Sequence, residues 1–358
     1  MRAIVVTRHG GPEALELQEQ PAPEPGPGQL LVDVEAAGVN YRDIYERAAS
    51  GHYARETPFI AGVEGAGTVA AIGAGVDDVA PGERVARGHY ARETPFIAGV
   101  EGAGRVAAVD TRVDGIAPGD RVAWSAGQGS YAEQVALDAD GVVPVPDGIT
   151  TEVAAAALLQ GMTAHYLATS TYPVQPGDTV IVHAAAGGVG LLLTQIVKLR
   201  GGRVIATTSS EEKAELARGA GADETLGYES FAERARELTG GEGVAAVYDG
   251  IGADTFDDSL AALRPRGYMV LYGAASGQPP PVEIAKLNAG SLYLTRPTLA
   301  NYGTERGELL ERSGEVFGWI AAGELDVRIG ARYPLEDAAR AQADLESRAT
   351  TGKLILTA

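Results

Sequence analysis

Residues 178–199 contain the feature that most restricts the fold of this chain. Residues 180–182 are apolar and β-branched, and residues 184–190 read AAAGGVG. Four apolar side chains then recur at helical spacing: Leu191, Leu192, Ile196 and Leu199. Glycines between a strand and a helix let the backbone approach a pyrophosphate, whose charge the first amides of the helix stabilise. The segment therefore predicts a strand, a tight turn and a helix that together bind a dinucleotide.

The surrounding chain strengthens this interpretation. Ala185 stands where a strict motif has its first glycine, so the glycines could instead serve only tight packing of strand on helix. However, from about residue 178 to 273 strand patterns alternate with helical patterns, which is typical of βαβ units around a parallel sheet. We therefore predict a doubly wound Rossmann domain, with these residues of the turn as cofactor contacts: Gly187, Gly188, Val189 and Gly190.

The end of the second strand distinguishes the two nicotinamide cofactors. An acidic residue there would bind the ribose 2′-hydroxyl and repel a 2′-phosphate. The chain instead reads TTSSEEK, with Ser209 and Ser210 near the strand end and Lys213 one helical turn later. Glu211 and Glu212 fit the first turn of the next helix, which Ser210 would cap. The pattern favours NADPH over NADH, although Lys213 could also be an ordinary surface lysine.

The N-terminal part of the chain has a different pattern. Up to about residue 150 it reads as short β segments interrupted by glycine and proline, which predicts a small barrel-like β domain. Residues 51–87 and 88–124 are a tandem repeat, and its first 17 positions are identical in the two copies. Two copies are too few for a repeat architecture. We expect one copy to fill the barrel and the other to form a surface excursion.

Composition excludes several classes of function. The formal net charge of −19 opposes binding to nucleic acid, and no stretch has the apolar length of a membrane span or a secretory signal. We therefore expect a cytoplasmic protein with no nucleic-acid or membrane partner. The chain has no cysteine, which excludes disulfides and thiolate metal sites. The five histidines show no ligand spacing, so we predict no metal: His9, His52, His89, His165 and His183.

With these features established, the sequence resembles the zinc-free quinone oxidoreductases of the medium-chain dehydrogenase/reductase superfamily. The resemblance covers essentially the whole chain once one copy of the repeat is set aside. The segments that carry it are GVNYRDIY (38–45), PFIAGVEGAG (58–67 and 95–104), LLQGMTAHY (158–166), VHAAAGGVG (182–190), SSEEKAELA (209–217), VYDGIG (247–252), LRPRGYMVLYG (263–273), GSLYLTRPTL (290–299) and LESRATTGK (345–353).

The resemblance implies a domain plan and an assembly. It implies an α/β protein with a GroES-like β-barrel catalytic domain at residues 1–161 and 299–358. A Rossmann domain that binds NADPH would occupy residues 162–298. It further implies a homodimer formed largely through the Rossmann sheets.

The resemblance also implies roles for individual residues. Asn40 would lie beside the nicotinamide and Thr163 near the cofactor at the hinge between domains. Lys213 and Tyr228 would contact the adenosine phosphate, with Arg348 at the phosphate end of the cofactor. Gly252 and Tyr272 would line the cofactor groove. Tyr45 would face the substrate, as would Tyr53 or its duplicate Tyr90, and only one of these two can occupy the place in one subunit.

The expected chemistry is hydride transfer without a metal. Zinc-dependent relatives place a histidine beside a glutamate, whereas this chain has Val63 before Glu64 and Val100 before Glu101. A quinone is electron-poor enough to accept hydride without a Lewis acid, so alignment and stabilisation of the developing anion suffice. Asn40 and Tyr45 are the candidates for that hydrogen bonding. Tyr45 could equally be a packing residue, and Asp43 is read as a structural partner at the helix start.

Two other functions remain open on sequence alone. The first is NADPH-dependent reduction of α,β-unsaturated carbonyls by an enoyl or 2-alkenal reductase. The second is a non-enzymatic role as an NADPH-binding structural or RNA-associated protein, against which the negative charge argues. The sequence specifies neither the physiological acceptor nor one- or two-electron reduction. It also does not specify which copy of the repeat fills the catalytic domain, or whether the duplication is natural.

Overall fold

The computed structural model describes residues 1–26, 28–49, 57–61, 64–72, 101–106, 116, 119–125, 129–303 and 305–358. The chain forms two compact units. One unit combines Met1–Leu159 with Ile329–Ala358, and the other is Gln160–Arg328. The first unit is mainly β and the second is α/β, as the sequence pattern predicts.

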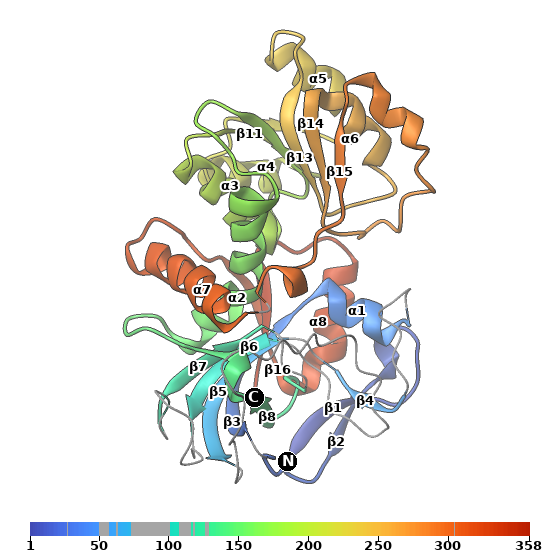
Figure 1. Ribbon diagram of the computed structural model, residues 1–358. Coiled ribbons are helices and arrows are strands. Elements are labelled where there is room, and N and C mark those ends of the chain that lie inside the picture. The colour runs from blue at the N-terminus through green and yellow to red at the C-terminus, as the bar shows by residue number, and fades with distance from the viewer. Residues whose placement is uncertain are drawn as a thin grey trace. The chain divides into compact units, whose positions relative to one another are not determined.

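The second unit contains a six-stranded parallel sheet in the order β12-β11-β10-β13-β14-β15 (Figure 1). Its strands are β10 (Thr179–Val182), β11 (Arg203–Thr207), β12 (Glu224–Leu226), β13 (Val244–Asp249), β14 (Leu263–Leu271) and β15 (Tyr293–Thr295). Between them run α3 (Gly188–Leu199), α4 (Glu211–Gly219), α5 (Phe231–Leu238) and α6 (Phe256–Ala262). The chain proceeds from β10 outward to β12 and then returns to place β13 beside β10. This is the predicted doubly wound topology.

The central strands of this sheet are buried on both faces. Val180, Val182 and Val204 belong to one apolar cluster, whereas Ile181, Ile205 and Val247 belong to another. Successive side chains of a strand point to opposite faces, so an uninterrupted apolar run fills two cores at once. Such strands are typical of a parallel sheet that helices cover on both sides.

The second unit extends further along the chain than the Rossmann domain predicted at residues 162–298. Its boundary lies after Arg328 because α7 (Arg306–Ala321) packs within this unit. Val316 and Leu325 lie in the same buried cluster as the first strand of the sheet. The prediction placed these residues with the β domain, because an amphipathic helix does not reveal from its sequence which core it covers.

The first unit contains two sheets. A three-stranded sheet has the order β2-β1-β4, and an eight-stranded sheet has the order β16-β17-β3-β5-β6-β7-β9 with β8 paired to β3. The strands are β1 (Arg2–Val6), β2 (Leu15–Glu19), β3 (Gln29–Val39), β4 (Phe59–Ile60), β5 (Glu64–Ile72), β6 (Glu101–Val106), β7 (Arg121–Trp124), β8 (Gln134–Asp138), β9 (Val142–Pro144), β16 (Ile329–Pro334) and β17 (Lys353–Thr357). Its helices are α1 (Tyr41–Arg47), α8 (Ala338–Glu346) and the first part of α2 (Thr151–Tyr166).

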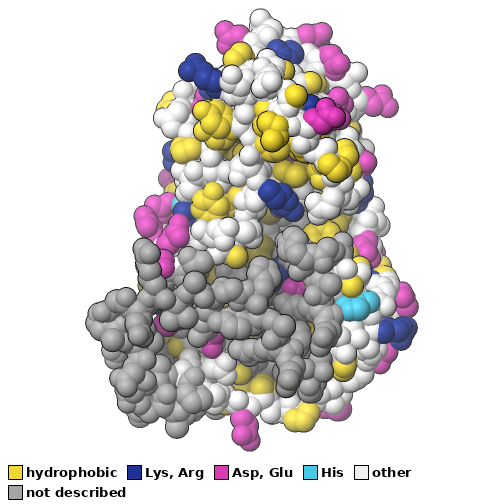
Figure 2. Space-filling view, turned by 45° about the vertical axis from the view of Figure 1, so that its right-hand side comes forward, with side chains coloured by type: hydrophobic (Ala, Val, Ile, Leu, Met, Phe, Trp, Pro, Cys, Tyr) yellow, Lys and Arg dark blue, Asp and Glu magenta, His cyan; other side chains and the backbone are white. Residues whose placement is uncertain are grey.

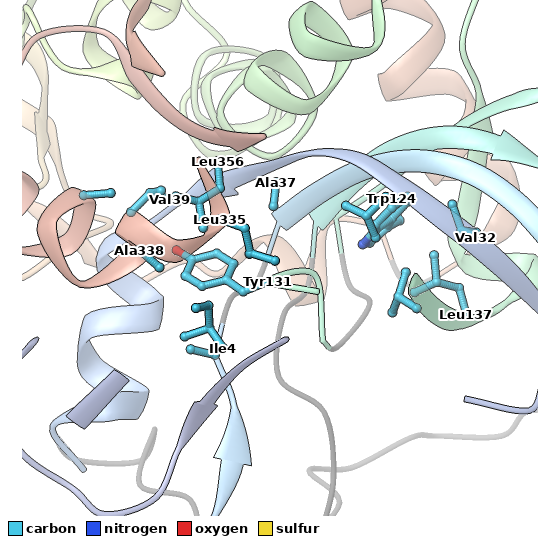
Figure 3. Packing of buried hydrophobic residues seen from close by; sticks show 14 of the residues in the cluster. Ile4, Val32, Ala37, Val39, Trp124, Tyr131, Leu137, Leu335, Ala338 and Leu356 are labelled. Atoms are coloured by element: carbon cyan, nitrogen blue, oxygen red, sulfur yellow. The ribbon is translucent and has the colours of Figure 1, made fainter. Parts of the chain in front are cut away.

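Both ends of the chain build the core of the first unit (Figure 3). Ile4 and Tyr131 from the N-terminal segment pack in the same cluster as Leu335 and Leu356 from the C-terminal segment. The last strand, β17, pairs antiparallel with β3 and parallel with β16. The segment Ile329–Ala358 is therefore an integral part of the β unit.

The two copies of the repeat are aligned to the same strand. Ala123 of β7 lies opposite Ala66 of β5 and also opposite Ala103 of β6. β9 pairs with the same residues of β7. A strand has two hydrogen-bonding edges, and β9 occupies one edge of β7. The other edge of β7 has room for one strand, for which β5 and β6 are both candidates. Identical sequence gives identical register, which is why the copies compete. The predicted excursion itself lies outside the described residues.

We predict that either copy can occupy this edge. Because the chain has no cysteine, single disulfides can report the pairing. The variants Ala66→Cys/Ala123→Cys and Ala103→Cys/Ala123→Cys should both form intramolecular disulfides, since antiparallel neighbours lie within bridging distance. Non-reducing peptide mapping measures the bridged fraction, with Ala123→Cys alone as the control. A disulfide in only one double variant would show that one copy holds the edge permanently.

Candidate active site

The turn that follows β10 has the shape expected of a dinucleotide-binding loop. Ala184 has a left-handed backbone with φ of 49°, and its amide donates a hydrogen bond to the Tyr228 hydroxyl at 3.2 Å. Gly187 is the N-terminal cap of α3, and its amide donates to the Ala184 carbonyl at 2.9 Å. The amides of the first turn of α3 have no partners within the helix, so they are suited to bind an anion.

Gly190 brings α3 against this turn. A Cβ atom at this position would lie 2.4 Å from the Ala184 carbonyl oxygen and 2.7 Å from the Cα atom of Ala185. No other residue fits without moving backbone. The close approach of helix and turn is the role of the last glycine in dinucleotide-binding motifs, and it explains why Ala185 is tolerated at the earlier position.

All the predicted cofactor segments of the second unit, Thr163 excepted, follow the carboxyl ends of the parallel strands. The glycine turn follows β10, Ser209 to Lys213 follow β11, Tyr228 follows β12, Gly252 follows β13 and Tyr272 follows β14. The direction of winding reverses between β10 and β13, and open α/β sheets bind ligands outside the carboxyl ends of strands at such a switch point. The topology thus gathers residues that are distant in sequence at one edge of the sheet.

The end of β11 presents hydroxyl groups and an ammonium group. The Lys213 Nζ atom lies 3.3 Å from the Ser209 Oγ atom, and the Ser210 Oγ atom accepts a hydrogen bond from the Lys213 amide at 3.3 Å. Ser210 therefore caps α4, and Glu211 and Glu212 lie in the first turn as predicted. No carboxylate occupies residues 207–210 at the strand end. These donors fit a 2′-phosphate better than a free ribose hydroxyl.

The loop after β13 is held by a buried carboxylate. The Asp249 Oδ1 atom accepts hydrogen bonds from the amides of Ile251 and Gly252 at 2.7 and 3.0 Å. Gly252 has φ of 96°, and a Cβ atom there would lie 2.5 Å from the Gly277 carbonyl oxygen. This position therefore requires glycine. Sequence reasoning missed Asp249, for which the only signal was an aspartate at the end of a buried strand.

Tyr272 stands beside this loop. A Cβ atom added to Gly250 would lie 2.9 Å from the Tyr272 hydroxyl oxygen, so the phenol lies close against the backbone. Burial raises the pKa of Tyr272 above its ordinary value. The phenol is consequently neutral at physiological pH.

In the first unit, Asn40 immediately precedes α1 and is 6% exposed. The Lys353 Nζ atom donates a hydrogen bond to the Asn40 Oδ1 atom at 2.9 Å. With Nζ as the donor, this contact orients the side-chain amide of Asn40, with Oδ1 toward Lys353 and Nδ2 as its own donor. Lys353 lies 313 residues from Asn40, and sequence reasoning missed it.

Asp43 completes this buried polar cluster. Its Oδ2 atom accepts hydrogen bonds from the backbone amide of Asn40 at 2.9 Å and from the Tyr131 hydroxyl at 2.8 Å. Burial, with a smaller contribution from Glu46, raises the pKa of Asp43 to about 8, and burial lowers the pKa of Lys353 well below its usual value. Asp43 therefore holds the backbone at the start of α1, which agrees with its predicted structural role.

The other candidate residues are distributed over both units. Tyr45 is half-buried on α1, with its ring centroid 6.2 Å from that of Tyr41. Thr163 is buried on α2. Arg348 is exposed and has φ of 58°. Burial raises the pKa of the Tyr41 phenol, and the Arg348 guanidinium group opposes this shift. Tyr53 and Tyr90 lie outside the described residues.

In the described part of the chain, no group of three histidine, aspartate or glutamate side chains is arranged to hold a metal ion. None of the described helices is long and apolar enough to cross a membrane. Acidic and basic side chains are interspersed on the face shown in Figure 2, where they do not form separate patches.

Comparison with known proteins gives a consistent result. Residues 188–313 match the family model described as zinc-binding dehydrogenase. Residues 26–91 and 86–147 each match the alcohol dehydrogenase GroES-like domain. The GroES-like model matches twice because the duplicated segment lies within this domain. The family name does not imply a thiolate zinc site here, since the chain has no cysteine.

Curated relatives extend over the whole chain. A quinone oxidoreductase of Pseudomonas aeruginosa is 40% identical over 99% of this chain and 99% of its own length. A 2-haloacrylate reductase of a Burkholderia species is 36% identical over 99% of this chain and 98% of its own length.

Solved structures show the same similarity. A mycobacterial protein in complex with NADPH has a TM-score of 0.88 and 47% identity, with 100% of both chains covered. The Escherichia coli quinone oxidoreductase in complex with NADPH has a TM-score of 0.86 and 36% identity, again with 100% of both chains covered.

Reversing the charge of Lys213 tests the predicted cofactor preference. Lys213→Glu should weaken NADPH binding roughly 10- to 100-fold and change NADH binding far less, because a charge-assisted hydrogen bond to a phosphate contributes about 1.5–3 kcal/mol. Fluorescence titration of both cofactors measures the change. Lys286→Glu, the same substitution at a lysine paired with Asp257, is the control. Equal losses for NADPH and NADH would remove Lys213 from the 2′-phosphate site.

Substitution of Gly190 tests the close packing of α3 on the turn. Gly190→Ala should lower the free energy of unfolding by about 1–3 kcal/mol and weaken NADPH binding, because the added methyl group meets backbone atoms. Thermal denaturation and NADPH titration measure the two effects. Gly219→Ala is the matched control, since no atom lies within 4 Å of a Cβ there. An unchanged affinity in Gly190→Ala would contradict a role for this packing in cofactor binding.

Proposed function

This chain belongs to the quinone oxidoreductase family of the medium-chain dehydrogenases/reductases, and from that premise we propose that it transfers hydride from NADPH to quinones without a metal. The observation that carries the proposal is the group of donors at the end of β11. Ser209, Ser210 and Lys213 stand there beside the glycine turn, in place of an acidic residue. The full-length similarity to quinone oxidoreductases supports the same activity.

The second unit fits the cofactor along the carboxyl edge of its sheet. We assign the pyrophosphate to the amides at the start of α3, where Gly187, Gly188, Val189 and Gly190 leave room for close approach. Lys213 and the hydroxyl groups of Ser209 and Ser210 would neutralise the 2′-phosphate, with Tyr228 and Arg348 as further contacts. Gly252 and Tyr272 would border the cofactor groove, and Thr163 would contact the cofactor. NADPH supplies the hydride when bound.

The first unit would supply the groups that orient the reactants. Since Lys353 holds the Asn40 Oδ1 atom, the Nδ2 atom is the donor of this side chain, and one of its N–H bonds is directed at the Gly38 carbonyl oxygen at 3.5 Å. We assign this donor to the nicotinamide end of the reaction, where a fixed hydrogen bond aligns the groups and requires no reorganisation during transfer. Tyr45 would donate from its phenol to the quinone oxygen. Tyr53 or Tyr90 would do the same, according to which copy of the repeat fills the domain.

The substrate class follows from the lack of an electrophilic metal site in the sequence. The chain has no cysteine, and valine precedes Glu64 and Glu101 where zinc-dependent relatives have histidine. A quinone carbonyl accepts hydride without such activation, and solvent can protonate the resulting quinol oxygen. We further propose that the protein is a cytoplasmic homodimer with a small-molecule substrate and without a nucleic-acid or membrane partner.

A second candidate activity is the reduction of an electron-poor carbon–carbon double bond. The similarity to a 2-haloacrylate reductase supports it, because that protein's named substrate is an activated alkene. The two activities require the same cofactor and the same alignment of the hydride. They differ in the shape of the substrate pocket.

A substrate panel separates the two activities. We expect NADPH oxidation, followed by absorbance, with 1,4-benzoquinone and 9,10-phenanthrenequinone, and little with 2-alkenals, crotonyl thioesters or 2-haloacrylate. NADH should support a much lower rate at equal concentration. Reduction of the alkenes without reduction of the quinones would assign the second activity. Absence of turnover with either class, despite NADPH binding, would contradict both.

A further inference from the structure

His183 occupies a central place beneath the cofactor segments. It directly follows β10 and directly precedes the glycine turn, and its side chain is completely buried. Its ring packs edge-on against Phe231 with the centroids 4.8 Å apart. The sequence predicted no metal at this histidine, because it lacks the spacing of a metal ligand.

Both ring nitrogens of His183 have hydrogen-bonding partners on other strands and helices. The Nδ1 atom lies 2.7 Å from the Thr207 Oγ1 atom, on the last residue of β11. The Nε2 atom lies 2.9 Å from the Ser259 Oγ atom on α6. Ser259 in turn donates to the Asp249 Oδ2 atom at 3.2 Å. The network thus extends from the end of β10 to the ends of β11 and β13.

The partners determine which nitrogen of His183 carries the proton. Asp249 acts as an acceptor at both oxygens, since Oδ1 receives two amides and Oδ2 receives the hydroxyls of Thr255 and Ser259. Ser259 has a single hydroxyl proton, which it gives to Asp249. The His183 Nε2 atom must therefore be the donor to Ser259, and Nδ1 must accept from Thr207.

Burial keeps the ring in this neutral form. It lowers the pKa of His183 to about 4, against the opposing effect of the Asp249 charge. A second proton on Nδ1 would make the ring a buried cation, which burial disfavours. The neutral ring protonated at Nε2 gives each printed contact of the network one donor and one acceptor.

We propose that His183 is a positioning residue for NADPH, whose neutral ring ties together the three strand ends that carry the cofactor loops. This inference rests on the NADPH binding proposed above. The glycine turn starts at the next residue, Thr207 lies two residues before Ser209, and Asp249 holds the amide of Gly252. Each of these segments ends a different strand, and the strands have no covalent link nearby. The ring fixes their relative positions before the cofactor arrives, which reduces the entropy lost on binding.

Substitutions of His183 test the positioning role through binding. His183→Asn and His183→Gln each retain part of the polar pattern, whereas His183→Phe retains only shape. We expect the dissociation constant of NADPH to increase roughly 10-fold or more in His183→Phe, which corresponds to a loss of at least about 1.4 kcal/mol of binding free energy. The increase should be smaller in the two amide variants. The rate at saturating NADPH should change less than the KM for NADPH.

The control is a second buried histidine of the same unit. His165 contacts Glu315 and Arg312 rather than the cofactor loops. His165→Asn should lower the melting temperature without a comparable loss of NADPH affinity. An NADPH affinity in folded His183→Phe equal to that of the unsubstituted protein would overturn the proposal. Equal losses of affinity in the His165 and His183 variants would overturn it as well.

A spectroscopic measurement checks the protonation state independently of binding. In ¹⁵N-histidine-labelled protein, the signals of His183 are identified as those that are missing from His183→Asn. Their chemical shifts should be those of a ring protonated at Nε2 and unprotonated at Nδ1 from pH 5 to 9. A doubly protonated ring or the opposite tautomer at pH 7 would overturn the network. Neither the NADPH titration nor the ¹⁵N spectrum uses a quinone, so a failure of quinone reduction would refute the proposed reaction without affecting these two outcomes.

The same network predicts a dependence of stability on acid. Asp249 and Tyr228 are the titratable groups that face the ring. Between pH 6.5 and about 4 the unfolded imidazole binds a proton that the folded one does not, so the free energy of unfolding should decrease as the pH falls through this range. The free energy of unfolding of the His183→Gln variant should decrease less over the same pH range. An identical pH dependence in the two proteins would contradict a buried neutral imidazole.

Discussion

The close contact between α3 and the turn after β10 is the constraint on which the rest of the second unit depends. Gly190 allows the helix to approach the Ala184 carbonyl. The first amides of α3 therefore lie beyond the carboxyl end of β10, where open α/β sheets bind ligands. The return of β13 to the side of β10 then places a second loop next to the first. His183 lies under both loops and connects them to the end of β11. The proposed cofactor site thus consists of short segments that lie at one edge of the sheet and that one buried ring connects.

The first unit also contains a buried polar cluster that joins segments distant in sequence. Asn40 begins α1, but the orientation of its amide depends on Lys353, which belongs to the last strand of the chain. Asp43 and Tyr131 stabilise the backbone beside it. Such a cluster requires the two ends of the chain to share one β domain. The pairing of β17 with β3 provides this arrangement, and it explains why a segment after the Rossmann unit returns to complete the first domain.

The duplicated segment shows how identical local sequence creates a conflict that only the sheet reveals. Each copy contains the same strand with the same register to β7, and β7 has one edge left for them. The sequence predicted this competition, because a barrel built for one set of strands has no second place. It did not predict which copy would pair, since the two strands are identical over EGAG and differ only from Thr68 and Arg105 onward. The proposed contact of Tyr53 or Tyr90 with the substrate depends on the same choice.

The sequence by itself determined the fold class, the cofactor turn, the donors at Ser209 to Lys213 and the family. These features are local, because a strand, a glycine turn, a helix cap and a charged side chain all lie within a few residues of one another. It placed the end of the second unit too early, at residue 298, since α7 could cover either core. Only the tertiary structure assigned Lys353 to Asn40 and connected His183 to Thr207 and Ser259. Those contacts join residues up to 313 positions apart, and a buried polar group is matched to its partner by chain topology rather than by any local pattern.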